Sequence, residues 1–453
     1  MDSISNISSN FIVCDLSKEQ NIVSIKEEYL TDSFVPSDNY NISFTASQPK
    51  QLKTHLPECP KKSVEFINDF NKKLGLSAKD IVKKDALMRD SVLSFYRATP
   101  ALFFNDIFGS YSEKSSLLPN PPAIVINGDT HIGNFGIVKS PEGKAIWGIN
   151  DFDQSAKGSP EWDLARLASS LALKAREIKL NESDQKKLVE IFSKTYCDTV
   201  FSIESGKALP QPYLTHSSSE GAVKKLIEKS SEKEHKDLLI KYTSAADGKL
   251  IFKYDNELHP VSQKIREKAE NALKSFETDP KEKHTFNIFD VCEKKDSGGS
   301  SYGLKRYWVL AANDKNPIPV IIELKQLMPS SVIDRSGDLS KADGKSILDG
   351  QKSLGGLQNK LSGYTSIDGC TYLVREREAV KATVNLSKID NFEKLSQLAC
   401  QSAKTLAGSH CNEKGNSKLI SDWIGGENKT LSSKLADFAI LYAQQTEANF
   451  KEF

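Results

Sequence analysis

Two short apolar segments, each leading directly into a cluster of polar residues, constrain the fold of this chain most. Ala-Ile-Val-Ile at 123–126 leads into Asn-Gly-Asp at 127–129, and residues 146–149 lead into Asn-Asp-Phe-Asp at 150–153. Short apolar runs bounded by turn residues are typical of buried strands. Ser-Pro-Glu-Gly at 140–143 is a turn signal, so we expect the two segments to form a hairpin. The two polar clusters would then meet at one end of that hairpin.

The polar clusters contain a carboxylate, an amide and a second carboxylate. Phosphoryl transfer from a nucleotide requires a carboxylate that orients the nucleophile, together with oxygen ligands for Mg²⁺. We therefore predict Asp129 as the catalytic base and Asn134 and Asp151 as metal ligands. His131 either orients Asp129 through a ring hydrogen bond or is a loop histidine with a local partner. Asp153 either contacts the metal or occupies a surface turn.

Three residues outside these loops also have predicted roles. Residues 160–174 have a strong helical pattern with a proline near the start, and Asp163 lies in the first turn. We expect Asp163 to hold the predicted catalytic loop in place through hydrogen bonds with the backbone of that loop. Arg97, at the end of a helical stretch over 80–97, either binds phosphate or forms a helix-end salt bridge. His410 is predicted to pack in a helical core.

A glycine-rich segment and a lysine form a second constellation. Residues 297–303 lie between two of three strand-like segments within 284–325, and the third of these ends at Lys325. Glycines allow backbone N–H groups to approach phosphate oxygens closely. The helical stretch after the lysine offers no obvious glutamate partner, and Asp349 is the predicted partner instead. The predicted nucleotide-binding residues are Gly298, Gly299, Ser300, Ser301, Gly303, Lys325 and Asp349.

Changes in composition divide the chain into four parts. Residues 1–60 are rich in Ser, Asn and Asp without periodicity, which indicates a flexible or peripheral arm. Residues 61–280 carry the catalytic and metal-binding loops together with a charged helical insertion. Residues 281–375 are strand-like and contain the glycine loop and lysine, and residues 376–453 are helical. The chain is therefore predicted to be α+β.

These motifs resemble those of the bacterial domain-of-unknown-function 2252 family, over roughly residues 60–450. That family's loop is in turn similar to the loop of aminoglycoside and choline phosphotransferases. The resemblance implies an ATP site in which Asp129, Asn134 and Asp151 have the roles given above. Asn127 stands where those enzymes have a histidine, so a structural contact is expected to be lost. The matching segments include Gly-Asp-x-His-x-x-Asn-Phe-Gly (128–136), Asn-Asp-Phe-Asp (150–153), Trp-Asp-Leu-x-Arg-Leu-Ala-x-Ser (162–170), Gly-x-Ser-x-Gly-Leu-x-Arg-Tyr (299–307), Leu-Lys-Gln (324–326) and Tyr-Leu-Val-Arg (372–375).

The order of the motifs differs from that of ordinary kinases, in which the glycine loop and lysine precede the catalytic loop. A site needs its residues to meet in space, whatever their order in the chain. We therefore predict a circularly permuted, two-lobed protein-kinase-like fold. A mostly helical C-lobe with the catalytic loop comes first and a small antiparallel-sheet N-lobe follows. A hinge near residues 372–375 then leads to the closing helices.

The leading functional prediction is an ATP- and Mg²⁺- or Mn²⁺-dependent transferase. It would move a phosphoryl group, or a nucleotidyl group if the triphosphate binds in reverse, to a small-molecule or protein acceptor. A nucleotide-binding pseudokinase with a regulatory role is the main alternative. A metallophosphoesterase is less favoured, because only His131 of the seven histidines belongs to a polar cluster.

Composition restricts the remaining classes. Lysine and arginine (61) nearly balance aspartate and glutamate (60), so no nucleic-acid partner is predicted. The seven cysteines are scattered without a C-x-x-C pair, as expected for a reducing compartment. No apolar run reaches the ~18–20 residues of a membrane span. The N-terminus has no secretory-signal pattern. We expect a cytoplasmic protein, and export as a secreted effector into a host cell stays open.

Overall fold

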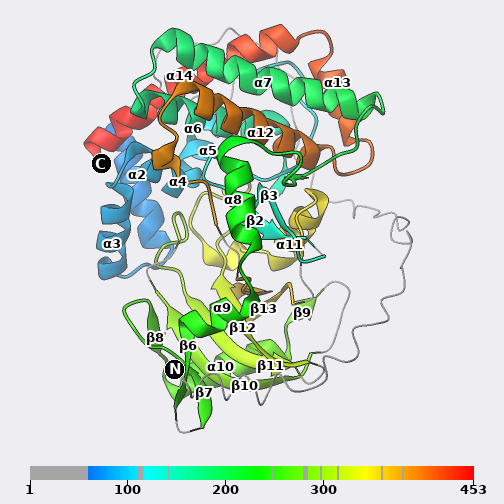
Figure 1. Ribbon diagram of the computed structural model, residues 1–453. Helices are drawn as coiled ribbons and strands as arrows, with labels where there is room; N and C mark the ends of the chain where they lie inside the picture. The colour runs from blue at the N-terminus through cyan, green and yellow to red at the C-terminus, as the bar shows by residue number, and fades with distance from the viewer. Residues whose placement is uncertain are drawn as a thin grey trace, which may run out of the picture.

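The computed structural model describes residues 60–109, 116–140, 142–246, 248–278, 284–295, 298–313, 316–358, 361–379 and 382–453. Within these residues the protein is α+β, as predicted. Helices gather in one part of the molecule and a large antiparallel sheet forms the other (Figure 1). The predicted arm lies outside the described residues, except for its last residue, Pro60.

The hairpin between the two polar clusters, called the catalytic hairpin after its predicted role, is formed by β2 (Phe135–Lys139) and β3 (Ala145–Ile149), with Phe135 opposite Ile149. The prediction that the segment at 123–126 pairs with the segment at 146–149 was therefore wrong. The first segment forms β1 (Ile124–Ile126), which pairs with β4 (Ala156–Gly158) instead of β3. The prediction missed β2 because its strand pattern, which contains a glycine, follows the polar loop without a break. Since β2 begins after one polar cluster and β3 ends before the other, the two clusters still meet at one end of a hairpin.

Helix α6 (Pro160–Glu177) lies at the centre of the helical part and confirms the helix predicted over residues 160–174. Ser159 caps it by accepting a hydrogen bond from the backbone N–H of Glu161, and proline occupies the first turn, where no donor is lost. Almost all of its side chains through Ala175 are buried. Such a helix, apolar on most sides, is surrounded by other helices.

The surrounding helices come from distant parts of the chain. Three long helices pack around α6 and share one hydrophobic core with it. They are α7 (Glu182–Glu204), α12 (Phe392–His410) and α14 (Asn428–Glu452). The other helices of this part are α2 (Pro60–Lys73), α3 (Ala78–Met88), α4 (Val92–Ala98), α5 (Pro100–Phe108), α8 (Gly221–Ser231) and α13 (Asn416–Ile424).

Seven strands of the described residues form one antiparallel sheet, in the order β8-β10-β11-β12-β14-β13-β9. The predicted strands within 284–325 and at 372–375 are present in it. The strands are β8 (Leu258–Pro260), β9 (Glu277–Thr278), β10 (Phe286–Lys294), β11 (Arg306–Asn313), β12 (Asn316–Gln326), β13 (Gly363–Ile367) and β14 (Cys370–Glu376).

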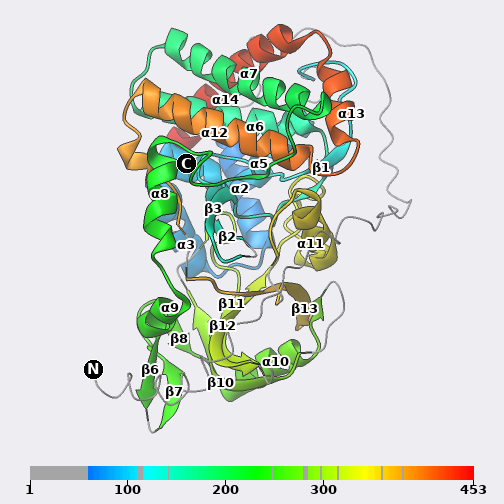
Figure 2. The same ribbon diagram turned by 45° about the vertical axis from the view of Figure 1, so that its right-hand side comes forward.

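Both faces of this sheet are covered. Helix α10 (Gln263–Lys274) covers one face. Helix α9 (His235–Tyr242) and the β6–β7 hairpin (Thr243–Ala246 and Lys249–Phe252) cover the other. These elements already belong to the sheet part, which therefore begins earlier in the chain than residue 281. Helix α11 (Gly344–Ser353) lies between the two parts and contacts β13 and β1 (Figure 2).

After β14 the chain leaves the sheet and returns to the helical part. Thr383 forms a bridge with Gly136 of β2, and the N–H of Ile137 donates to the carbonyl of Ala382 at 2.8 Å. On its other side, β3 pairs with β5 (Tyr213–Leu214). The catalytic hairpin therefore lies where the chain passes between the two parts, with the sheet on one side and α6 on the other.

Candidate active site

A cleft of about 800 Å³ opens between the helical part and the sheet. It is lined by α3, α4, the two polar loops, the glycine loop and the ends of β12 and β14. The structure thus brings the two predicted constellations together. The predicted residues that line the cleft are Asp129, His131, Asn134, Asp151, Asp153, Gly298, Gly299, Ser300, Ser301 and Lys325.

Asp163 of α6 holds the catalytic loop in place. Its fully buried carboxylate accepts hydrogen bonds from the backbone N–H groups of Asn127 (2.8 Å) and Gly128 (2.9 Å). The predicted support of this loop by Asp163 through backbone hydrogen bonds is therefore confirmed. Gly128 has φ +75°, a conformation that residues with a side chain rarely adopt, and this turn directs the following Asp129 into the cleft.

Behind Asp163, a second buried layer fixes the carboxylate. His410 Nε2 lies 3.1 Å from Asp163 Oδ2, and His410 Nδ1 lies 2.8 Å from the hydroxyl of Tyr196. All three side chains are fully buried. The predicted core packing of His410 is confirmed, and its ring also connects α12 to the catalytic loop through Asp163.

Asn127 joins the two polar loops. Its amide nitrogen donates to the backbone carbonyl of Asp151 at 2.8 Å, and its amide oxygen accepts from the N–H of Asp129 at 3.2 Å. The asparagine at this position therefore makes structural contacts of its own with both loops.

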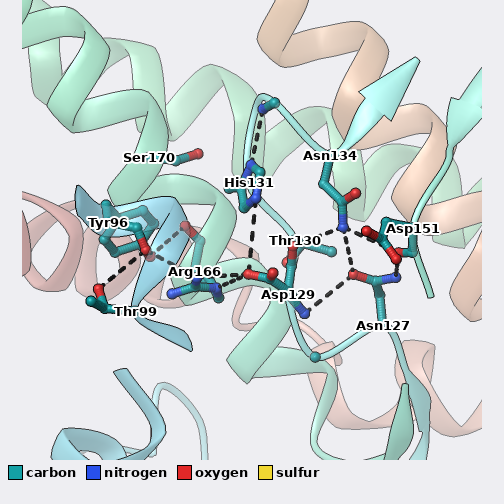
Figure 3. A network of polar contacts seen from close by, with 12 residues as sticks. Tyr96, Thr99, Asn127, Asp129, Thr130, His131, Asn134, Asp151, Arg166 and Ser170 are labelled. Atoms are coloured by element: carbon teal, nitrogen blue, oxygen red, sulfur yellow. Dashed lines mark hydrogen bonds and ion pairs between the residues drawn. The ribbon is translucent and has the colours of Figure 1, made fainter. Parts of the chain in front are cut away.

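Asn134 has an amide orientation set by its partners (Figure 3). Its Nδ2 donates to the backbone carbonyls of Asp129 (3.0 Å) and Asp151 (3.2 Å) and lies 3.4 Å from Asn127 Oδ1. Since all three partners are acceptors, the nitrogen must face them. The amide oxygen is therefore directed away from these groups and can act as a cation ligand.

Asp129 is paired with a buried arginine. Its Oδ1 accepts from Arg166 Nε at 2.7 Å and lies 2.6 Å from Nη2. The Arg166 guanidinium also lies over the rings of Tyr96 and Phe103, which fixes its position. Burial raises the pKa of Asp129 to about 6, against the opposing effect of Arg166. The group is therefore mostly ionised at neutral pH.

His131 is close to Asp129 but does not orient it. Burial, together with Arg97 and Arg166, holds the pKa of His131 well below its usual value, so the ring is neutral. Its Nδ1 accepts from the N–H of Gly133 at 3.1 Å, which leaves the ring proton on Nε2. That nitrogen lies 4.0 Å from Asp129 Oδ1, too far for a hydrogen bond. Arg166 is the residue that orients Asp129.

Lys325 connects the two constellations. Its Nζ forms an ion pair with Asp153 Oδ2 and lies 3.6 Å from Asp151 Oδ2. Burial and the neighbouring Asp151 raise the pKa of Asp153, while Lys325 lowers it. The predicted partner Asp349 was wrong: its carboxylate pairs with Lys345, one turn earlier on α11, at 2.5 Å. The pairing with Asp349 failed because the position of α11 depends on tertiary packing that the local pattern does not show.

The glycine loop is anchored from the helical part. The buried Lys84 of α3 donates to the Ser300 carbonyl at 2.8 Å and to Asn71 Oδ1 at 3.0 Å. Burial lowers the pKa of Lys84 to about 8. Gly298 has φ +104°, which requires glycine. Gly303, predicted to bind nucleotide, does not line the cleft and instead packs beside the start of α3: an added Cβ would lie 2.9 Å from Leu76 Cδ2, just before the helix, and 3.2 Å from Asp80 Cβ.

Further charged residues of the cleft were missed by the prediction. The buried Glu323 of β12 accepts from Arg375 Nε at 2.9 Å, and Arg306 Nη1 lies 3.5 Å away. Both arginines line the cleft. A sequence signal could have identified Glu323 and Arg375, because each is a charged residue within an otherwise apolar strand. The two strands are Ile-Ile-Glu-Leu (321–324) and Tyr-Leu-Val-Arg (372–375).

A divalent cation would find oxygen ligands at Asn134 and Asp151. The Asn134 amide oxygen is directed away from its loop partners, and the Asp151 side chain is 40 % exposed in the cleft. Mg²⁺ usually takes one or two protein oxygens and completes its shell with substrate phosphates and water. These residues therefore fit a nucleotide-bound Mg²⁺. Within the described ranges, no group of three or more His, Cys, Asp or Glu side chains is arranged to hold a metal ion.

Comparison with known proteins gives one match. The model of a family described as "Uncharacterized protein conserved in bacteria (DUF2252)" matches residues 78–453. This range begins at α3 and includes both polar loops, the glycine loop and Lys325. No curated protein and no solved structure gives a significant match. Among the helices that the structure describes, none has the length and apolar character needed to cross a membrane.

Proposed function

The chain belongs to the DUF2252 family of bacterial proteins, and for this member we propose an ATP- and Mg²⁺-dependent transferase with a protein-kinase-like site. The contact of Lys325 with Asp151 and Asp153 carries the proposal. This contact brings together a lysine at the end of a strand, next to the glycine loop, and a polar loop whose carboxylates can act as oxygen ligands. Nucleotide phosphates need both kinds of group, and the cleft of about 800 Å³ is large enough for a nucleotide.

Asp129 is the proposed base. Arg166 holds one of its oxygens and keeps the carboxylate oriented, and Oδ2 has no hydrogen-bond partner among the described residues. This oxygen would accept the proton of an acceptor hydroxyl. The acceptor oxygen then forms a bond to the γ-phosphorus, the bond from that phosphorus to the bridging oxygen of the β-phosphate breaks, and ADP leaves.

Binding of the nucleotide is assigned to groups from both parts of the molecule. Lys325 would pair with the α- and β-phosphates, and the backbone of residues 298–301 would cover them. Asn134 and Asp151 would hold Mg²⁺, or Mn²⁺, which neutralises negative charge on the phosphates. Before this happens, Lys325 has to exchange its ion pair with Asp153 for the phosphates.

The order of these groups in the chain supports a circularly permuted kinase-like fold. The catalytic hairpin and α6 come first, and the sheet with the glycine loop between β10 and β11 comes later. From β14 the chain returns to the catalytic hairpin and then forms the closing helices. The two parts face each other across the catalytic hairpin, as the lobes of a kinase would (Figure 2).

A nucleotide-binding pseudokinase is the second candidate. It is favoured by the partners of Lys325, which are the proposed metal-site carboxylates rather than a glutamate on a helix. Glu323, on the same strand, is bound by Arg375. A pseudokinase would bind ATP in the same cleft without transferring a group from it, so binding and turnover have to be measured separately.

Thermal unfolding with and without ATP and Mg²⁺ tests the binding site. Ligand at a hundred times its Kd stabilises the folded state by about 2.7 kcal/mol, a Tm shift of a few degrees. We expect this shift in the wild type and in Asp349→Ala, a control on α11 outside the cleft. It should be lost in Asp151→Ala and Lys325→Ala.

Only the ligand-induced shift is compared, because breaking the ion pair also changes the Tm of the free protein. A wild type that shows no shift with any nucleotide and metal would overturn the proposal. Incubation with ATP labelled on the γ-phosphate or, in a parallel reaction, on the α-phosphate then separates a transferase from a pseudokinase, because phosphoryl transfer moves the first label and nucleotidyl transfer the second. A transferase labels itself or an added acceptor fraction and loses this activity in Asp129→Asn, whereas a pseudokinase binds without labelling.

A further inference from the structure

We propose that Arg97 of α4 binds the γ-phosphate of ATP beside Asp129, an inference that rests on the proposed function and specifies how the triphosphate lies in the cleft. Arg97 belongs to neither polar loop and precedes both in the chain. It occupies the last turn of α4 and lines the cleft.

The guanidinium of Arg97 lies against the catalytic loop. A Cβ added at Gly133 would be 3.0 Å from Arg97 Nε and 3.1 Å from Cζ. The same position is 3.3 Å from His131 Nδ1, so arginine and histidine meet over this glycine. Gly133 therefore leaves the space in which the guanidinium reaches the loop that carries Asp129.

The glycine loop approaches Arg97 from the other side. A Cβ on Gly299 would lie 3.9 Å from the backbone carbonyl of Arg97, and the next residue, Ser300, is held by Lys84. The end of α4 thus lies between the catalytic loop and the glycine loop. In a kinase-like site, the terminal phosphate lies between these two loops.

Arg97 contributes a positive charge to the cleft, beside the loop that carries Asp129. Asp129 is paired with Arg166, and Asp153 is paired with Lys325. Within the described part of the chain, the Arg97 side chain forms no hydrogen bond or ion pair, so the helix-end salt bridge considered from the sequence is absent there. A guanidinium exposed to a cleft can bind phosphate oxygens through two parallel hydrogen bonds.

The position of Arg97 selects one orientation of the triphosphate. The phosphate that reacts must lie next to the base, and Arg97 is the unpaired cation on that side of the cleft among the described residues. With the γ-phosphate at Arg97, the α- and β-phosphates extend toward Lys325. Arg97 would then also stabilise the charge on the transferred phosphoryl group. This orientation favours phosphoryl transfer over nucleotidyl transfer.

The test is a calorimetric titration of Mg²⁺ complexes of AMP, ADP and the β,γ-imido analogue of ATP. Wild-type protein should bind the triphosphate more tightly than ADP. Arg97→Ala should weaken triphosphate binding about tenfold to hundredfold, the loss expected for a charge-assisted hydrogen bond, and leave ADP and AMP unchanged. Arg89→Ala is the matched control, because this arginine follows α3, stacks on Phe453 and does not line the cleft.

Gly133→Ala provides an independent variant. Its added methyl group displaces the Arg97 guanidinium without removing it, so it should weaken triphosphate binding selectively and to a smaller extent. Equal loss of triphosphate and ADP binding in Arg97→Ala, or no loss at all, would overturn the inference. Weaker AMP binding would overturn it too, since the α-phosphate would then lie at Arg97. If the wild type binds no nucleotide, the proposed function itself fails.

Discussion

Replacing Asp163 by asparagine removes the support of the catalytic loop with almost no change in shape. The carboxylate is fully buried and accepts from the N–H groups of Asn127 and Gly128, while His410 Nε2 lies 3.1 Å from Oδ2. Oδ1 serves Gly128, and Oδ2 serves the other two groups. Asparagine has one acceptor oxygen, and its amide group must face the remaining donors.

The cost follows from this geometry. In either amide orientation at least one backbone N–H loses its acceptor and faces another donor in a buried site. A hydrogen bond to a charged group contributes about 1.5–3 kcal/mol, and an unsatisfied buried donor costs about 1–3 kcal/mol. We therefore expect Asp163→Asn to lower the free energy of unfolding by about 2–4 kcal/mol.

Urea unfolding followed by circular dichroism measures this loss. The control is Asp422→Asn, which removes an exposed carboxylate paired only with Lys418 and should cost less than about 1 kcal/mol. Hydrogen–deuterium exchange should also become faster at the Asn127 and Gly128 amides. A loss in Asp163→Asn equal to that of the control, with unchanged exchange at these two amides, would refute this account of the catalytic loop.

Three further predictions concern the same cleft. The turnover rate should fall as the pH decreases through about 6, because the raised pKa of Asp129 lets it take up a proton there, and a flat pH–rate profile would contradict its role as base. Glu323→Gln should lower the Tm, since removing a buried partner of arginines costs about 3–5 kcal/mol, and an unchanged Tm would show that the charge is dispensable. Gly128→Ala should lower the Tm far more than Gly143→Ala: both have positive φ, but only the first Cβ would lie 2.3 Å from the carbonyl oxygen of Gln154.

Features encoded by local patterns could be predicted from the sequence. The apolar strands ending in Asn-Asp-Phe-Asp (150–153) and at Lys325, and the helix that carries Asp163, are contiguous signals. The kinase-like arrangement of the motifs further led us to expect the glycine loop and Lys325 close to the polar loops, although β3 and β12 belong to different sheets. The meeting of Asp151 and Lys325 in one cleft agrees with that expectation.

Features that depend on tertiary contacts could not be predicted. Lys84 reaches Ser300 across 216 positions of the chain, and nothing in the pattern around either residue indicates this contact. The same limit explains why Arg166 was not considered as the residue that orients Asp129, whereas His131 was one of two open possibilities: His131 is a sequence neighbour of Asp129, and Arg166 lies on the next helix. The partner of β3 was misassigned because β2, its actual partner, contains a glycine and follows the polar loop without a break, so its strand pattern was not recognised.

Covalent labelling of the nucleotide site tests the central claim most directly. An ATP derivative that carries an acyl group on its terminal phosphate transfers this group to a lysine amine near the bound phosphates, and mass spectrometry identifies the lysine. The account predicts acylation of Lys325, suppressed by an excess of ATP and Mg²⁺ and abolished in Asp151→Ala. Acylation confined to exposed lysines such as Lys345, or labelling of Lys325 that ATP does not suppress, would contradict a single nucleotide site built from the two constellations.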